Sequence, residues 1–272
     1  GAEVVAALDL ARDLLAIEPD TRTIEEESST NIGSVLWPRP HARFDTWEYG
    51  QILREEMPTL VDAAGIEALE LLCGLLEEVL RLYEKPGLSS APNDYSYVWR
   101  PSIDRDDEPG EKINNLLVTA IRDAGARLLE AGASQVLGTI ERHSYRVFQR
   151  IGLHFRRKWP QADPVGTARL LQYAEVVNDT HLWPELCELL RERFGELPAG
   201  AQEGYVALVE QGPTEYRSSL SQNGTDESPT TKDIETSARL WQYGRLIPIQ
   251  EYLPDHWRTR VDALRQQFGD LE

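Results

Sequence analysis

The chain has few cysteines and no long apolar run. Only Cys73 and Cys187 occur among 272 residues, each in an apolar helical stretch, and there is no Cys-x-x-Cys pair. Disulfide frameworks and thiolate metal sites need more cysteines, so we expect two buried free thiols and a cytoplasmic location. Because no apolar run approaches the roughly 20 residues that cross a bilayer, and there is no signal peptide, we expect no membrane association.

Sequence motifs for catalysis are also missing. There is no phosphate-binding glycine loop, no His-Glu-x-x-His and no Gly-x-Ser-x-Gly. His143 and Ser144 are adjacent, and adjacent side chains on a helix do not face each other, so we expect Ser144 to cap the helix that follows. We therefore predict no catalytic residue, no metal site and no cofactor. An enzyme whose site is assembled from distant residues remains the least favoured alternative.

Acidic residues outnumber basic ones by 46 to 28, which gives a formal net charge of −18. Such a charge repels phosphate backbones and anionic lipids, so general nucleic-acid or membrane-surface binding is disfavoured. Hydrophobic residues make up 41% of the chain, which is enough for a folded core.

Apolar residues recur at spacings of three and four nearly everywhere, which is typical of amphipathic helices. Strand-like alternation is absent. Asp163-Pro164 is a helix-start signal, and Gly195 is expected to end a helix in the left-handed conformation. The fold class we predict is all-α, with antiparallel helical hairpins stacked as an α-solenoid. The clearest helices are expected over residues 4–15, 66–83, 113–128, 136–140, 147–159, 164–177, 183–194, 205–209 and 257–268.

Three stretches read as long irregular loops, near residues 18–43, 85–110 and 218–236. We expect an N-terminal helical region over 1–110 and solenoid-like repeats over 111–272, or one continuous domain. The Gly-Ala start resembles the scar of a cleaved tag, so we expect a fragment of a larger protein.

One internal repeat supports the solenoid interpretation. Residues 183–197 and 257–271 share Trp, Leu, Arg, Phe, Gly and a final Leu in register. Each copy reads as an amphipathic helix with an aromatic residue at both ends and a glycine stop.

A row of basic residues is the first candidate binding site. Its members recur every four residues and would form one ridge on a helix. Two interpretations stay open: ion pairs with Glu185, Glu188 and Glu192 of a neighbouring helix, or a site for a phosphorylated ligand, a nucleic-acid backbone or an acidic partner loop. The row consists of Arg142, Arg146, Arg150, His154 and Lys158, with Arg156 and Arg157 beside it.

Aromatic residues in two of the loops are the second candidate, namely Trp37, Tyr95, Tyr97 and Trp99. Such rigid amphipathic side chains often anchor interfaces. They either cover helix ends or dock onto another domain of the parent chain.

From residue 134 onward the chain resembles a HEAT- or armadillo-like α-solenoid. The resemblance rests on Tyr145–Ile151 and on the repeat with Trp183, Phe194-Gly195, Trp257 and Phe268-Gly269. The segments Phe44–Trp47 and Trp99–Ile103 resemble helical regions of large bacterial proteins in which a STAND- or NACHT-like ATPase, or another effector, is joined to a solenoid. Several such proteins act in defence against phage. The resemblance implies a sensor or scaffold part, and it implies no catalytic residue here.

These observations predict a non-enzymatic helical scaffold or sensor that recognises a protein partner or another domain of its parent. The alternative is a solenoid that binds nucleic acid or a phosphate ligand through the ridge from Arg142 to Lys158. The oligomeric state is left open.

Overall fold

The computed structural model describes residues 1–20, 39–83, 94, 96, 102–106, 112–213 and 231–270. These residues are mostly helical, which confirms the all-α expectation. They form two compact units, Gly1–Phe155 and Arg156–Glu272. Helices α5 (Ile66–Tyr83) and α6 (Ile113–Glu130), which flank the division that we expected near residue 110, pack against each other in the first unit. The boundary between the two compact units lies within α8 (Arg146–Lys158).

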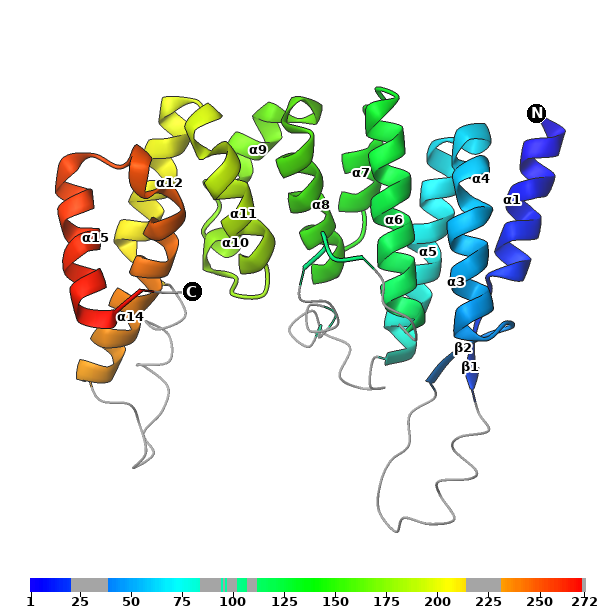
Figure 1. Ribbon diagram of the computed structural model, residues 1–272, viewed down its shortest axis with the longest axis horizontal. Helices are drawn as coiled ribbons and strands as arrows, with labels where there is room; N and C mark the ends of the chain where they lie inside the picture. Colours follow the sequence, from blue (N-terminus) through cyan, green and yellow to red (C-terminus); the bar gives the residue numbers. More distant parts are fainter. Residues whose placement is uncertain are drawn as a thin grey trace, which may run out of the picture. The chain divides into compact units, whose positions relative to one another are not determined.

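The core of the first unit lies between α5 and α6, which stand side by side in Figure 1. The apolar stripe of α5 is buried, including Leu69, Leu72 and Leu76, and both helices confirm the predicted periodicity. The other helices of this unit are α1 (Ala2–Leu14), α3 (Thr46–Glu55), α4 (Met57–Ala64) and α7 (Val136–Glu141), followed by the first ten residues of α8.

Helices α3 and α4 were not predicted from the sequence. Asp45 caps α3, because its carboxylate accepts a hydrogen bond from the Glu48 N–H at 2.8 Å. The two helices are separated at Glu56, just before Pro58. Proline has no N–H and cannot continue the hydrogen bonding of a helix interior, but it is tolerated in a first turn. Pro58 therefore explains why α3 ends and a new helix, α4, begins at this point.

A small antiparallel sheet corrects the expectation of a chain without strands, and it corrects the expected irregular loop over 18–43 at residues 18–20 and 39–42; residues 21–38 lie outside the described residues. Strand β1 (Ile17–Asp20) pairs with β2 (Arg39–Ala42), with Ile17 opposite Ala42. Pro19 faces Pro40, and proline is tolerated in strands that have an unpaired edge. The two strands were not predicted because each has only four residues and contains a proline, so neither shows the alternation of apolar and polar residues that indicates a strand.

The second unit is built from six α-helices and three short 3-10 helices among its described residues. The 3-10 helices are η3 (Pro160–Ala162), η4 (Phe194–Glu196) and η5 (Ile247–Tyr252). Asp163 caps α9 by accepting the Gly166 N–H at 2.9 Å, as the Asp-Pro signal predicts. The α-helices are α9 (Pro164–Leu170), α10 (Ala174–Asn178), α11 (Trp183–Arg193), α12 (Ala199–Gln211), α14 (Thr231–Leu246) and α15 (Asp255–Phe268).

Helix α14 begins inside the stretch 218–236, so the loop prediction is wrong for residues 231–236. It packs against both α12 and α15, and all three appear together in Figure 1. Its first half is polar and was read as a loop. Its second half carries Tyr243 and Leu246, which are fully buried.

The two copies of the repeat form α11 with η4 and α15, both in the second unit. They share an ion pair at equivalent positions, Arg191 with Glu188 and Arg265 with Asp262. The glycines differ, however. Gly269 has φ +80 and ends α15 as expected, whereas Gly195 lies within η4 and does not have positive φ.

Gly195 is instead required by close packing. A Cβ at this position would lie 2.4 Å from Cε1 of the Tyr252 ring. The Tyr252 ring also lies 5.9 Å, centroid to centroid, from that of Phe194. The predicted left-handed stop at Gly195 is therefore wrong, and the small side chain serves the packing of η4 against η5.

In the part of the chain that the structure describes, no helix is both long enough and apolar enough to cross a membrane.

Candidate functional site

The predicted basic row does not lie on one helix. Helix α7 ends at Glu141 and α8 begins at Arg146, so Arg142 lies outside α8. The exposed guanidinium of Arg142 donates to Glu70 at 2.7 Å and to Thr139 at 2.9 Å. The single ridge is thus wrong at its first member, because the chain leaves the helical conformation between the two helices.

The start of α8 is capped from a distant segment. The Arg146 N–H donates to the Asp94 carboxylate, and the Val147 N–H donates to Ser96 Oγ at 3.1 Å. These two amides belong to the first turn, which has no partner within its own helix. Ser144, which we expected to be the cap, has an exposed side chain, and the caps come from Asp94 and Ser96 instead.

Most members of the row on α8 point into the protein. Arg146 is half-buried, and Arg150 is only 1% exposed. His154 is buried as well, and its Nδ1 lies 3.1 Å from Asp104 Oδ1. The guanidinium and imidazole groups of Arg150 and His154 therefore face the interior of the first unit rather than a solvent-exposed ligand.

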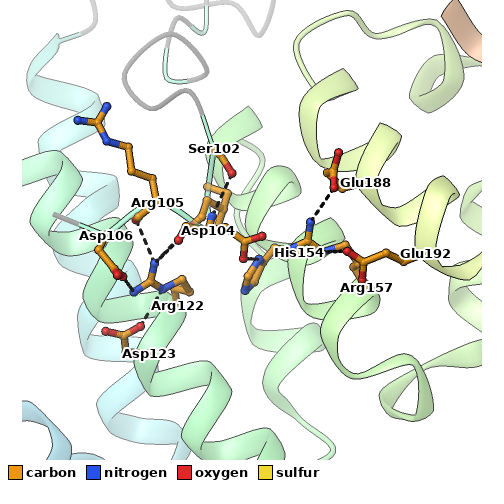
Figure 2. Close-up of polar contacts among 11 residues, drawn as sticks. Ser102, Asp104, Arg105, Asp106, Arg122, Asp123, His154, Arg157, Glu188 and Glu192 are labelled. Carbon is orange, nitrogen blue, oxygen red and sulfur yellow. Dashed lines mark hydrogen bonds and ion pairs between the residues drawn. The ribbon is translucent and has the colours of Figure 1, made fainter. Parts of the chain in front are cut away.

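The Asp104 contact belongs to a larger clamp on residues 102–106, which Figure 2 shows. Arg122 on α6 donates through Nη1 to the carbonyl oxygens of Ile103, Asp104 and Arg105 at 3.3, 3.2 and 3.0 Å. Its Nη2 donates to Asp106 at 2.9 Å, and its Nε to Asp123 at 2.7 Å. One guanidinium therefore fixes this segment, and His154 fixes it from α8.

Arg157 supports the internal interpretation directly. It is buried, and its guanidinium lies 3.7 Å from Glu188 Oε2 and 3.7 Å from Glu192 Oε1 of α11. Figure 2 shows both carboxylates directed toward it. This is the predicted pairing between the basic residues and the acidic face of the neighbouring helix. Lys158, the last member of the row, is exposed.

The aromatic candidates Trp37, Tyr95, Tyr97 and Trp99 lie outside the described residues. Among the residues that are described, no three His, Cys, Asp or Glu side chains gather as metal ligands. Cys73 is buried and free, and burial raises the pKa of its thiol. Cys187 is also free but only half-buried, so the expectation of two buried thiols is confirmed for the first alone.

A pocket that the sequence did not indicate lies in the second unit. Its volume is about 840 Å³, within the range of roughly 300–1,000 Å³ that is usual for ligand pockets. Val165, at 76% exposed, is a large apolar side chain on its wall. Apolar and small residues dominate the lining: Pro160, Pro164, Val165, Ala168, Leu197, Pro198, Gly200 and Ala201.

Three arginines also line the pocket, and two of them are held by neighbours. Arg156 pairs with Asp163 at 3.1 Å. Arg193 donates to the Arg157 carbonyl and to Glu196, each at 2.9 Å. Arg169 is exposed and forms no ion pair with any described residue. An apolar surface beside an available guanidinium suits an apolar group that is followed by an anion.

The sequence did not indicate this pocket because its lining comes from six elements between residues 156 and 201, namely α8, η3, α9, α11, η4 and α12. The one signal was proline. Pro160, Pro164 and Pro198 stand at the starts of η3, α9 and α12, and their rigid rings form part of the wall.

The described residues define an all-α protein with one small two-stranded sheet. A scan against protein-family models, a search of curated proteins and a search of solved structures gave no match for this chain.

Proposed function

We propose that this chain is a non-enzymatic helical scaffold that recognises a segment of a protein partner, with its hairpins stacked as an α-solenoid. The pocket beside Val165 is the observation that carries the proposal. Stacked helical hairpins bury a continuous core between neighbours and leave an extended surface for binding. The repeated helices α11 and α15 and their matched ion pairs support this arrangement.

The residues that line the pocket favour a partner segment of one kind of chemistry. An aliphatic side chain would cover Val165, Pro164 and Leu197, and burial of such surface drives association. A carboxylate one or two residues away would meet Arg169, whose planar fork matches it. The preferred occupant is therefore an extended peptide segment with an aliphatic residue next to Asp or Glu.

The second candidate function, binding of nucleic acid or a phosphate ligand through the basic row, has less support. Arg150, His154 and Arg157 are buried, and Arg142 is paired with Glu70. Lys158 is exposed, but one lysine gives little phosphate affinity in a chain with net charge −18.

A selection from random peptides tests the first candidate. A phage-displayed dodecapeptide library is panned on the immobilised chain, with the Val165→Asp variant as the counter-selection. Enriched peptides are expected to combine an aliphatic residue with a neighbouring acid. Their affinity should fall at least about tenfold on Arg169→Glu, and it should be unchanged on Leu240→Asp, a control at another exposed apolar side chain.

Two outcomes would overturn the proposal. One is that the wild-type chain and Val165→Asp enrich the same peptides. The other is that the chain binds a labelled single-stranded oligonucleotide with strong salt dependence and loses this binding on Lys158→Glu, which would favour the second candidate.

A further inference from the structure

A guanidinium lies close to two tryptophan rings in the second unit. Trp241 and Arg245 are four residues apart on α14, and Trp183 is the first residue of α11. The Arg245 Cζ lies 3.8 Å from the centroid of the Trp183 ring and 5.3 Å from that of Trp241. Arg245 is 4% exposed, whereas both rings are half-buried. The cation therefore lies just beneath the surface, with aromatic faces beside it.

The hydrogen bonding of Arg245 is incomplete. Its Nε donates to the Val177 carbonyl at 2.9 Å. Its Nη2 is buried and has no acceptor among the described residues. Burial lowers the pKa of Arg245 to about 10, so the group is still protonated at neutral pH. It thus remains a buried cation that forms no ion pair within the described chain, although the negative charge of Asp179 acts on it and partly offsets the lowering of its pKa.

The indole of Trp241 provides a second donor without an acceptor. Its Nε1–H is buried and has no partner in the part of the chain that is described. Side chains four residues apart on a helix are neighbours on one face, so the two donors belong to one cluster. Buried donors are normally satisfied, and exceptions often mark a site for an absent ligand or water.

We propose that Arg245 and Trp241 form a binding site for a single carboxylate group. A carboxylate accepts hydrogen bonds from both donors, and its one negative charge neutralises the one guanidinium. A phosphate dianion would leave excess negative charge in a poorly solvated site.

This site is separate from the pocket beside Val165 and does not depend on the proposed function. None of the residues lining that pocket belongs to the tryptophan–arginine cluster. The carboxylate can come from a small organic acid or from an acidic side chain of a peptide. The two sources share the same recognition chemistry, and the experiment separates them.

The test follows the indole N–H signals of the seven tryptophans by NMR on the ¹⁵N-labelled chain. The Trp241 signal is assigned by its loss in Trp241→Phe. Sodium acetate is titrated at constant ionic strength against sodium chloride, and N-acetylglutamate N-methylamide is titrated in a parallel sample. The Trp241 signal is expected to shift saturably with acetate, and a matching shift with the glutamate derivative indicates that a peptide side chain also fits.

Variants provide the controls. Arg245→Lys keeps the positive charge but loses the planar pair of N–H donors of the guanidinium. The affinity for acetate should therefore fall at least about tenfold. Trp257 matches Trp183 in the repeat and also has an arginine over its ring, with the Arg260 Cζ 5.1 Å from the ring centroid. The Trp257 indole signal should not shift saturably with acetate. The proposal is overturned if the Trp241 signal responds to acetate and chloride alike, or if it shows transfer of magnetisation from a bound water that acetate does not displace. If Arg245→Lys does not fold, the titration of the wild-type chain alone still tests whether acetate binds at Trp241.

Discussion

The Phe155 ring lies against Gly125 so closely that a Cβ at Gly125 would be 2.2 Å from Cζ of the ring. Both residues are buried, Gly125 on α6 and Phe155 on α8. Only glycine allows the ring to approach the α6 backbone in this way. Glycine weakens an isolated helix, but it is needed at this position of α6 because the Phe155 ring packs against the helix backbone there.

Replacing Gly125 by alanine should destabilise the chain. The added methyl group would overpack a buried contact, at a cost of about 1–3 kcal/mol in the free energy of unfolding. Urea unfolding followed by circular dichroism measures this change. Gly74→Ala is the matched control, because nothing lies within 4 Å of its Cβ, and alanine should stabilise α5 by about 0.5–1 kcal/mol. Equal effects of the two substitutions would show that the contact does not matter.

The start of α8 should depend on the distant caps. Asp94→Ala removes the acceptor for the Arg146 N–H and should cost about 0.5–2 kcal/mol, the usual range for an N-cap. Hydrogen exchange of the Arg146 and Val147 amides should accelerate before that of amides later in α8. Ser144→Ala, at an exposed site, should leave these exchange rates unchanged, and faster exchange in this variant would instead favour a local cap.

These caps also show where prediction from the sequence ended. The stripes of α5 and α6 were found because an apolar face that repeats every three or four residues leaves few alternatives. The break between Arg142 and Arg146 was missed because Asp94 and Ser96, which satisfy the amides after the break, lie some fifty residues upstream. In the sequence, arginines spaced by four residues look the same whether they lie on one continuous helix or on two helices with a break between them.

The candidate sites were harder to predict for a related reason. The pairing of Arg157 with Glu188 and Glu192 was anticipated from the matching spacing of opposite charges. The pocket beside Val165 and the Arg245 cluster were not, since each brings together side chains from several short elements whose packing no local pattern specifies. Helix α14 was not predicted because its first half is polar; only its second half carries buried residues, among them Tyr243 and Leu246.

The internal role of Arg157 predicts a loss of stability when its partners are neutralised. The double variant Glu188→Gln with Glu192→Gln removes the two carboxylates that face the buried Arg157 guanidinium, which should cost about 1–2 kcal/mol because both acids are partly exposed to solvent. Thermal unfolding at low and moderate salt measures the effect. Lys158→Gln, at the exposed end of the row, should change the unfolding temperature little, and a larger loss there would indicate that the row has another role.

Tyr49 makes a contribution to the stability of the chain that is lost at alkaline pH. Its hydroxyl donates to the Leu15 carbonyl at 3.1 Å. Burial, together with the charge of Glu78, raises its pKa well above the ordinary value of about 10. Above that pH the unfolded chain releases the phenolic proton while the folded chain keeps it. Stability conferred by this group is thus fully present below pH ~10 and falls by about 1.4 kcal/mol for each further pH unit.

Tyr49→Phe should remove the contribution of Tyr49 to the alkaline loss of stability, while that of the buried Tyr205, whose pKa is also raised, stays. The variant is expected to be less stable at pH 7 by about 0.5–1.5 kcal/mol, because the Leu15 carbonyl loses its donor. The difference from the wild type should narrow as the pH rises from about 10 to about 11.5, the range where only the unfolded wild-type phenol ionises. Urea unfolding at a series of pH values measures the difference directly. Tyr173→Phe, at an exposed ring, should run parallel to the wild type. If Tyr49→Phe also runs parallel, the buried phenol ionises as readily in the folded chain as in the unfolded one.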